Sequence, residues 1–201
     1  MCCRYWTGES PEMREIVEEM NRSPLTARWQ KGVAAPGEIR PTDVVPVIAS
    51  NKAGARAVFP MRWGFKGKKL LLNARVETAP EKEAFRDAWN AHRCVVPAAY
   101  YFEWEHLTGA DGRKRTGSKY RIRPKDSAMT WLCGLYRIEE GMPVFVVLTR
   151  EAGESVRFIH DRMPMILPER CVGEWIDPRT KPERLVGAAL TDMICERVEE
   201  S

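Results

Sequence analysis

The chain has 201 residues, a formal net charge of +4 and a pI of about 8.8. Its length suits one domain with a sizeable core, and its mild basic excess is compatible with a nucleic-acid partner without identifying one. No apolar run approaches the ~20 residues that cross a bilayer, and the N-terminal residues lack the apolar core of a signal peptide. We therefore expect a cytoplasmic protein with no membrane partner.

Helical signals flank a β-rich middle. Ser10 is a predicted N-cap, followed by Pro11 and by apolar residues at helical spacing. Thr78 and Glu81 predict a capping box for a second helix. Short helices are expected at 155–160 and 168–175, and a last one over 182–198. Alternating or apolar runs predict strands at 44–49, 57–65, 70–75, 94–104, 119–123, 129–138, 144–149 and 163–167.

These elements predict an α+β fold. The expected architecture is a single domain over residues 1–201, with a β-rich, barrel-like antiparallel core flanked by a few helices. The six cysteines form no C-x-x-C pair and the chain has three histidines, so no metal site of the usual zinc type and no cofactor is predicted. Cys94 and Cys133 lie in apolar runs and are expected in the core of a reduced, intracellular protein.

Cys2 follows Met1 directly. Because cysteine is small, removal of Met1 by an aminopeptidase would make Cys2 the N-terminal residue. It would then carry an α-amine with a pKa near ~8 beside a thiol with a pKa near ~8.5, both partly nucleophilic at neutral pH. The pair can close on an aldehyde as a five-membered thiazolidine, and the thiol alone can attack an acyl carbon. Position alone favours chance as the explanation for a cysteine at this point.

A polar segment ends the strand expected at 70–75. Asn73 can donate and accept hydrogen bonds, and Arg75 can hold a phosphate through two parallel bonds. Glu77 can equally neutralise Arg75 in a structural pair. The segment therefore leaves a functional and a structural interpretation open.

Glu103 lies among aromatic residues near the end of a predicted strand. Alternation places Glu103 and Glu105 on one face, with Phe102 and Trp104 on the other. A desolvated carboxylate suits proton transfer, although an edge strand with one polar face explains the pattern as well. Trp104 could stack on a base of single-stranded nucleic acid or pack in the core.

His160 is expected at a junction between a helix and a strand, beside Asp161 and Arg162. Such junctions often present functional side chains, and an imidazole can donate or accept a proton near neutral pH. A structural or simply exposed histidine is the alternative.

In this order the motifs resemble those of the SOS-response-associated peptidase (SRAP) family, whose members shield abasic sites in single-stranded DNA. The resemblance spans residues 2–175. Four features depart from the family pattern: Cys3 replaces the usual glycine, the segment 33–37 lacks its usual asparagine, the loop after Trp63-Gly64-Phe65 is short, and a C-terminal segment of longer members is missing. The motifs that carry the resemblance are Met1-Cys2 with Arg4, Trp63-Gly64-Phe65, Asn73-Ala74-Arg75-Val76-Glu77-Thr78, Phe102-Glu103-Trp104 and His160-Asp161-Arg162-Met163-Pro164.

The resemblance implies an enzyme that crosslinks itself covalently to the aldehyde of an abasic site through a thiazolidine on Cys2. Glu103 would transfer protons around the Cys2 amine and in reversal, and His160 would donate a proton that opens the sugar ring. Asn73 would orient the sugar or the Cys2 backbone. The residues implied to contact DNA are Arg4, Arg75, Trp104 and Arg162.

The expected partner is therefore single-stranded DNA that contains abasic sites, bound by a monomer that associates with the nucleoid when it is on DNA. Three alternatives stay open. Cys2 could serve a cysteine peptidase that cleaves its own chain, or an N-terminal nucleophile amidohydrolase, although Cys3 replaces the glycine of that class. A non-covalent single-strand binding module would not need Cys2.

Overall fold

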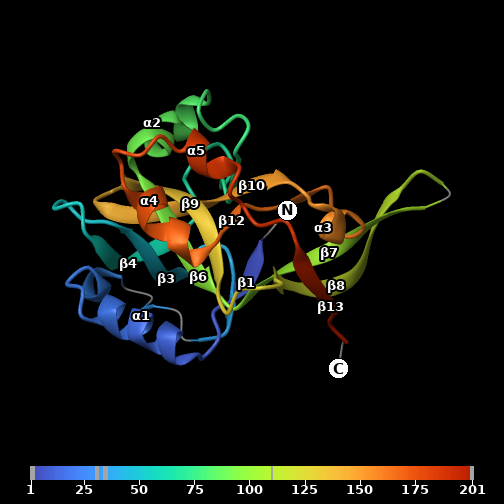
Figure 1. The fold of residues 1–201 in the computed structure, drawn as a ribbon, viewed down its shortest axis with the longest axis horizontal. Helices are drawn as coiled ribbons and strands as arrows, with labels where there is room; N and C mark the ends of the chain where they lie inside the picture. Colours follow the sequence, from blue (N-terminus) through green and yellow to red (C-terminus); the bar gives the residue numbers. More distant parts are fainter. Residues whose placement is uncertain (1–2, 30–31, 34–35, 110, 200–201) are drawn as a thin grey trace.

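The computed structural model describes residues 3–29, 32–33, 36–109 and 111–199, and Figure 1 shows their fold. No helix in these ranges has the length and apolar character needed to cross a bilayer. The helices are α1 (Pro11–Asn21), α2 (Glu83–Ala91), α3 (Glu154–Arg157), α4 (Val172–Ile176) and α5 (Glu183–Val186), with 3-10 turns at Thr26–Arg28 and Glu169–Cys171. The strands are β1 (Arg4–Trp6), β2 (Glu38–Ile39), β3 (Val44–Ser50), β4 (Arg56–Trp63), β5 (Asn73–Arg75), β6 (Arg93–Ala98), β7 (Tyr100–Thr108), β8 (Lys114–Pro124), β9 (Thr130–Glu139), β10 (Met142–Glu151), β11 (Arg162–Pro164), β12 (Ile166–Leu167) and β13 (Met193–Arg197).

Five strands close into a barrel in the order β10-β4-β3-β6-β9, and β9 pairs again with β10. The β3–β4, β3–β6, β6–β9 and β9–β10 pairs are antiparallel. The β10–β4 pair is parallel, with Phe145 opposite Trp63. The β-rich, barrel-like core with a few flanking helices is thus confirmed, and one parallel pairing completes its closure.

Side-chain alternation divides the barrel residues into two packed groups. Along β3, Val45, Val47 and Ala49 join one cluster, whereas Ile48 joins the other. The cluster that contains Ile48 also includes residues of α1, α2 and α4, so it covers the outside of the barrel. The cluster that contains Val45 and Val47 fills the inside of the barrel. There the rings of Trp63 and Phe145 stack with their centroids 6.1 Å apart.

A second sheet, ordered β13-β8-β7-β1-β2, packs against the barrel. In β1, Arg4 lies opposite Phe102 of β7 and Tyr5 lies opposite Tyr101. Tyr5 is fully buried, and its ring centroid is 5.4 Å from that of Trp63. The chain therefore enters the fold beside the middle of β7, while the far end of the β7–β8 hairpin projects from the body (Figure 1).

Several local predictions are confirmed and others are wrong. The hydroxyl of Ser10 caps α1 by accepting a hydrogen bond from the amide of Met13, as expected. The Thr78–Glu81 capping box is wrong, because consecutive turns follow Thr78 and α2 begins only at Glu83.

Two strand assignments also differ from expectation. The run 94–104 contains two strands, since the amide of Ala99 bonds to the carbonyl of Trp6 instead of continuing either ladder. The helix expected over 182–198 is wrong beyond α5, because Met193–Arg197 pairs with the edge of β8 as β13.

Arg93, at the start of β6, is buried and fixes two helix ends. Its guanidinium donates only to backbone carbonyls, from the ends of α2 and α4 and the turn beyond α4. Carbonyls at the end of a helix lack partners within the helix, so the guanidinium satisfies groups that burial would otherwise leave unpaired. The acceptors are the carbonyl oxygens of Trp89, Asn90, Trp175, Asp177 and Thr180.

We expect Arg93→Met to lower the free energy of unfolding by about 3 kcal/mol or more, because several buried carbonyls lose their donor at once. Urea denaturation measures the change. Arg86→Met, on the exposed side of α2, is the matched control and should stay within about 0.5 kcal/mol of the wild type. Equal stabilities of the two variants would contradict this role for Arg93.

Candidate active site

The predicted site residues come from three parts of the fold: the β1–β7 pair, strand β5, and the turn between α3 and β11. Cys2 lies outside the described residues. Cys3 is half-buried, and the pKa of its thiol is raised by burial and by the nearby carboxylate of Glu103. The chain that leads into β1 therefore lies within electrostatic range of Glu103.

Glu103 is a buried carboxylate on β7, with 3% of the residue exposed. Its Oε1 accepts a hydrogen bond from the amide of Trp104 at 3.2 Å. Glu105, expected on the same face, instead places its carboxylate against β8, where Oε2 accepts a hydrogen bond from the amide of Ser118 at 3.4 Å. The two acids thus occupy different surroundings, and Glu103 is the one in the interior.

A third group meets Glu103 beside an irregularity in the β7–β8 pairing. The register with β8 shifts between Trp104 and His106, as it does when a strand carries a bulge. Between these positions β7 advances by two residues and β8 by three, so the extra residue lies on β8. Residues three apart on a regular strand point to opposite faces, yet the side chains of Glu103 and His106 meet beside this irregularity. The amide of His106 then bonds to the carbonyl of Ile159 at 3.0 Å, which ties the hairpin to the turn that carries His160.

His160 is buried, with 7% of the residue exposed. Its Nδ1 accepts a hydrogen bond from the amide of Arg162 at 2.9 Å and lies 2.7 Å from Oδ1 of Asp161. Burial disfavours the charged ring and lowers the pKa of His160 to about 4, although Asp161 acts in the opposite direction. The ring is therefore neutral at pH 7, and its Nδ1 lies between an amide donor and a carboxylate.

Glu103, His106 and His160 meet at one point. One possible metal-ligating atom of each lies within 4.8 Å of those of the other two, and the two imidazole centroids are 4.1 Å apart. Sequence reasoning missed His106, because simple alternation places it on the opposite face from Glu103. Its only sequence signal was its rarity, since the chain has three histidines.

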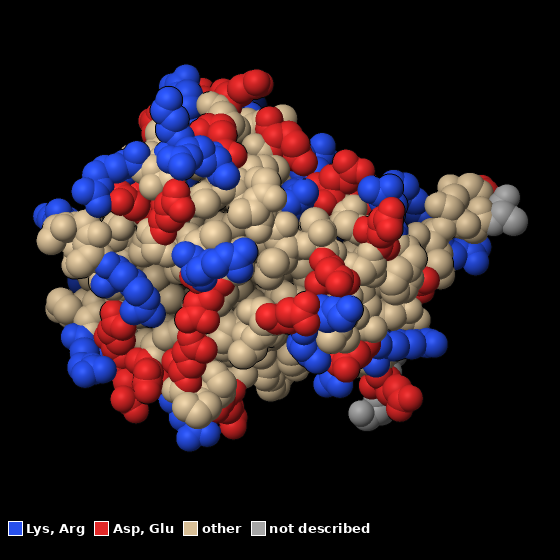
Figure 2. Space-filling view, viewed as in Figure 1, with Lys and Arg blue, Asp and Glu red and all other residues tan. Residues whose placement is uncertain are grey.

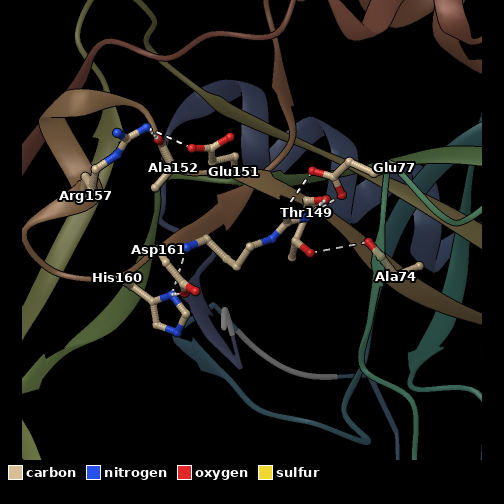
Figure 3. Close-up of polar contacts among 9 residues, drawn as sticks. Ala74, Glu77, Thr149, Glu151, Ala152, Arg157, His160 and Asp161 are labelled. Carbon is tan, nitrogen blue, oxygen red and sulfur yellow. Dashed lines mark hydrogen bonds and ion pairs between the residues drawn. The ribbon is translucent and has the colours of Figure 1, made fainter.

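Arg162 joins the turn between α3 and β11 to the segment that follows β5. Its guanidinium makes two parallel bonds to the Glu77 carboxylate, at 2.7 and 2.8 Å, and donates to the carbonyl of Thr149 at 2.8 Å. Figure 3 shows Glu77 and Thr149 on one side of this network and His160 on the other. The structural pair considered for Glu77 is therefore made with Arg162, not with Arg75. Hydrogen bonds from Arg162 lower the pKa of the Glu77 carboxyl.

Asn73 and Arg75 reach the site through β5, which runs parallel to β10. Asn73 lies opposite Val147 and Arg75 opposite Thr149. Arg75 is exposed, and none of the described residues forms an ion pair with it. It borders an open pocket of about 590 Å³ lined by Arg75, Glu77, Thr78, Glu151, Arg157, Asp161 and Arg162.

Arg4 and Trp104 lie on the other face of the β1–β7 pair. The guanidinium of Arg4 donates to Glu38 at 2.7 Å and lies 5.8 Å from the Trp104 ring. Lys119 approaches the same ring at 5.3 Å and also bonds to Glu38. Basic and acidic side chains are similarly interspersed over the face shown in Figure 2. The described residues on the face in Figure 2 form no single large basic patch.

Comparison with known proteins identifies relatives along nearly the whole chain. The family model described as SOS response associated peptidase (SRAP) matches residues 1–200. The chain is 36% identical to abasic site processing protein YoaM of Bacillus subtilis (strain 168), over 92% of this chain and 83% of that protein. It is 34% identical to abasic site processing protein YoqW of Bacillus phage SPbeta, over 92% of this chain and 84% of that protein.

A solved structure shares the fold. The crystal structure of a protein from Bacteroides thetaiotaomicron superposes with a TM-score of 0.74 and covers 98% of this chain and 92% of that one. The identity is 21%, so this likeness concerns the arrangement of the barrel, the second sheet and the helices.

We expect Glu77→Gln to reduce stability most at neutral pH. The folded-state pKa of Glu77 is lowered, so its contribution is present above the ordinary glutamate pKa of about 4.3 and is lost as the pH falls through the folded value. Urea unfolding at pH 7 and below pH 4 should therefore show a difference between wild type and Glu77→Gln that shrinks with acid. A difference that grows with acid would contradict the pairing.

Proposed function

Because the chain belongs to the SOS response associated peptidase family, we propose that it processes abasic sites in single-stranded DNA and that Cys2 captures the lesion covalently. The observation that carries the proposal is the pairing of β1 with β7. In that pairing Arg4 lies opposite Phe102, the neighbour of the buried Glu103. Burial, together with the carboxylate of Glu103, raises the pKa of the half-buried Cys3 thiol.

The chemistry balances without an oxidant or a metal. With Met1 removed, the α-amine of Cys2 adds to the aldehyde carbon of the ring-opened deoxyribose, and loss of water leaves an imine. The thiol then adds to the imine carbon, forming a C–S bond. The electron pair of the C=N bond moves to nitrogen, which also takes up the thiol proton. The net change is the release of one water for each thiazolidine formed.

Glu103 and His160 are suited to the proton transfers in this sequence. Glu103 would accept a proton from the amine as it attacks and return one to the hydroxyl that leaves as water. His160 would donate a proton to the sugar-ring oxygen, and the contacts of its Nδ1 with the amide of Arg162 and with Asp161 would hold the ring in place. Asn73, on β5 beside β10, would orient the sugar or the Cys2 backbone.

The flanking strand would be held by cations and by one aromatic ring. Arg75 is exposed beside the pocket and suits a phosphate contact. Arg4 could add a second contact by exchanging its bond to Glu38 for a phosphate, and Trp104 offers a ring on which a base could stack. Arg162 is bound to Glu77, so we propose that it positions β5 against β11 and reaches a phosphate only if Glu77 releases it.

A crosslinking assay tests the proposal. Single-stranded DNA with one abasic site should give a protein–DNA band that survives denaturing electrophoresis, and Cys2→Ala should abolish it because no thiol remains to close the ring. Intact mass should show that the reactive protein lacks Met1, since a retained Met1 blocks the amine as an amide. An equal yield of crosslink from Cys2→Ala would refute the thiazolidine. Tight DNA binding with no band would favour the non-covalent module.

Glu103→Gln should slow formation of the crosslink by the order of 100-fold, because the amide cannot transfer protons. Glu105→Gln is the matched control, two residues away on the same strand with its carboxylate against β8, and should react like the wild type. Single-turnover rates at saturating DNA give the comparison. If Glu103→Gln and His160→Ala both keep the wild-type rate, the proton-transfer roles are wrong even where Cys2 is required.

A further inference from the structure

We propose that Glu103, His106 and His160 bind one divalent transition-metal ion of the zinc class, and that the bound ion closes the site to an abasic sugar. One ligating atom from each side chain already lies within 4.8 Å of the others. Tetrahedral zinc, with bonds near ~2.1 Å, requires ligand atoms about 3.3 Å apart. A small inward movement therefore completes the geometry.

The donor set matches this class of ion. Two imidazoles and one carboxylate, with a fourth position left for water, form a common zinc site in proteins. Glu103 and His160 are both buried, so their ligating atoms lie inside the fold. His106 is exposed at the rim, so its ring can close over an arriving ion and the ion has a path from solvent.

Asp161 supplies the outer support that a ligating histidine usually needs. Metal-bound imidazoles commonly donate their second N–H to a carboxylate, which fixes the ring and raises its basicity. Oδ1 of Asp161 lies 2.7 Å from Nδ1 of His160. When Nε2 binds the ion, the ring proton is held on Nδ1 and donated to Asp161, while the amide of Arg162 gives up this acceptor. No net change in the ring's proton count is needed.

The arrangement of β7 is what makes the third ligand available. His106 follows the register shift between β7 and β8, and the bond from its amide to the carbonyl of Ile159 holds it beside His160. The three proposed ligands therefore come from two separate chain segments, strand β7 and the turn between α3 and β11. Two of the three are histidines, so the site is not a cluster of acids.

The consequence for function rests on the proposed reaction. An ion held by Glu103 and His160 occupies the two groups that would move protons during crosslinking. We therefore expect Zn²⁺ to inhibit the reaction and chelation to restore it. His106 packs against His160, so the decisive quantity is the ratio of rates with and without Zn²⁺ in each variant. Removal of His106 should bring this ratio to one, whatever the rate without the ion.

Binding is measured first, on the protein alone. Zn²⁺ in calorimetry should bind at one site per chain, and Co²⁺ should give the visible spectrum of a four-coordinate ion. His106→Ala and His106→Gln should weaken binding by at least about tenfold, and Asp161→Ala by about 10- to 100-fold. His92→Ala, which removes the third histidine from the far end of α2, should bind like the wild type.

Two results in this binding experiment would overturn the inference. One is wild-type affinity in both His106 variants. The other is a strong sulfur-to-cobalt charge-transfer band that disappears with Cys3→Ser while loss of His106 has no effect, since the ion would then sit on thiols. Both readouts are independent of DNA, so they decide the metal site even if the protein forms no crosslink.

The reaction supplies the second test. Zn²⁺ at concentrations that saturate the wild type should reduce its crosslinking rate at least about tenfold, in line with loss of its acid–base groups. His106→Ala should keep its rate with and without the ion, and His92→Ala should be inhibited like the wild type. Equal inhibition of wild type and His106→Ala would overturn the proposed closure of the site.

Discussion

The hydrogen-bond ladders on the edges of β10 are the constraint on which the site depends. β4 and β5 pair with this strand on one side, and β9 and then β11 pair with it on the other. Asn73 and Arg75 are therefore set across one strand from Arg162, although almost 90 residues separate these segments in sequence. The Arg162–Glu77 pair then locks the two ends together over the carbonyl of Thr149.

The barrel was predictable because its strands are buried and alternate regularly. Apolar runs such as those of β3, β6 and β10 indicated strands, and their burial on closure of the barrel explains why both faces are apolar. The errors arose where local signals compete with distant ones. Thr78 has the chemistry of a helix cap, yet the backbone is drawn into turns after Val76 bonds to Thr149. The segment that forms β13 was expected to be helical, but its amides pair with the open edge of β8.

The candidate site was predictable in its residue types and less so in their partners. Sequence alone cannot say which acid neutralises which base, because that choice is made by segments that meet only on folding. Arg4 and Arg162 carry bidentate-capable guanidiniums, but each already has a carboxylate partner, Glu38 or Glu77. Any phosphate they bind must compete with a carboxylate, so their contribution to affinity is smaller than their charge suggests.

The pairing of β7 with β8 also bears on how such a site could change during evolution. Substitution alters the chemistry of a side chain but leaves it on the same face of its strand. Insertion or deletion of one residue between Trp104 and His106 would instead exchange the faces of everything beyond it. His106 would then turn away from Glu103 with no change in its own identity. The number of residues in this stretch, more than their kinds, governs whether a second imidazole meets the buried acid.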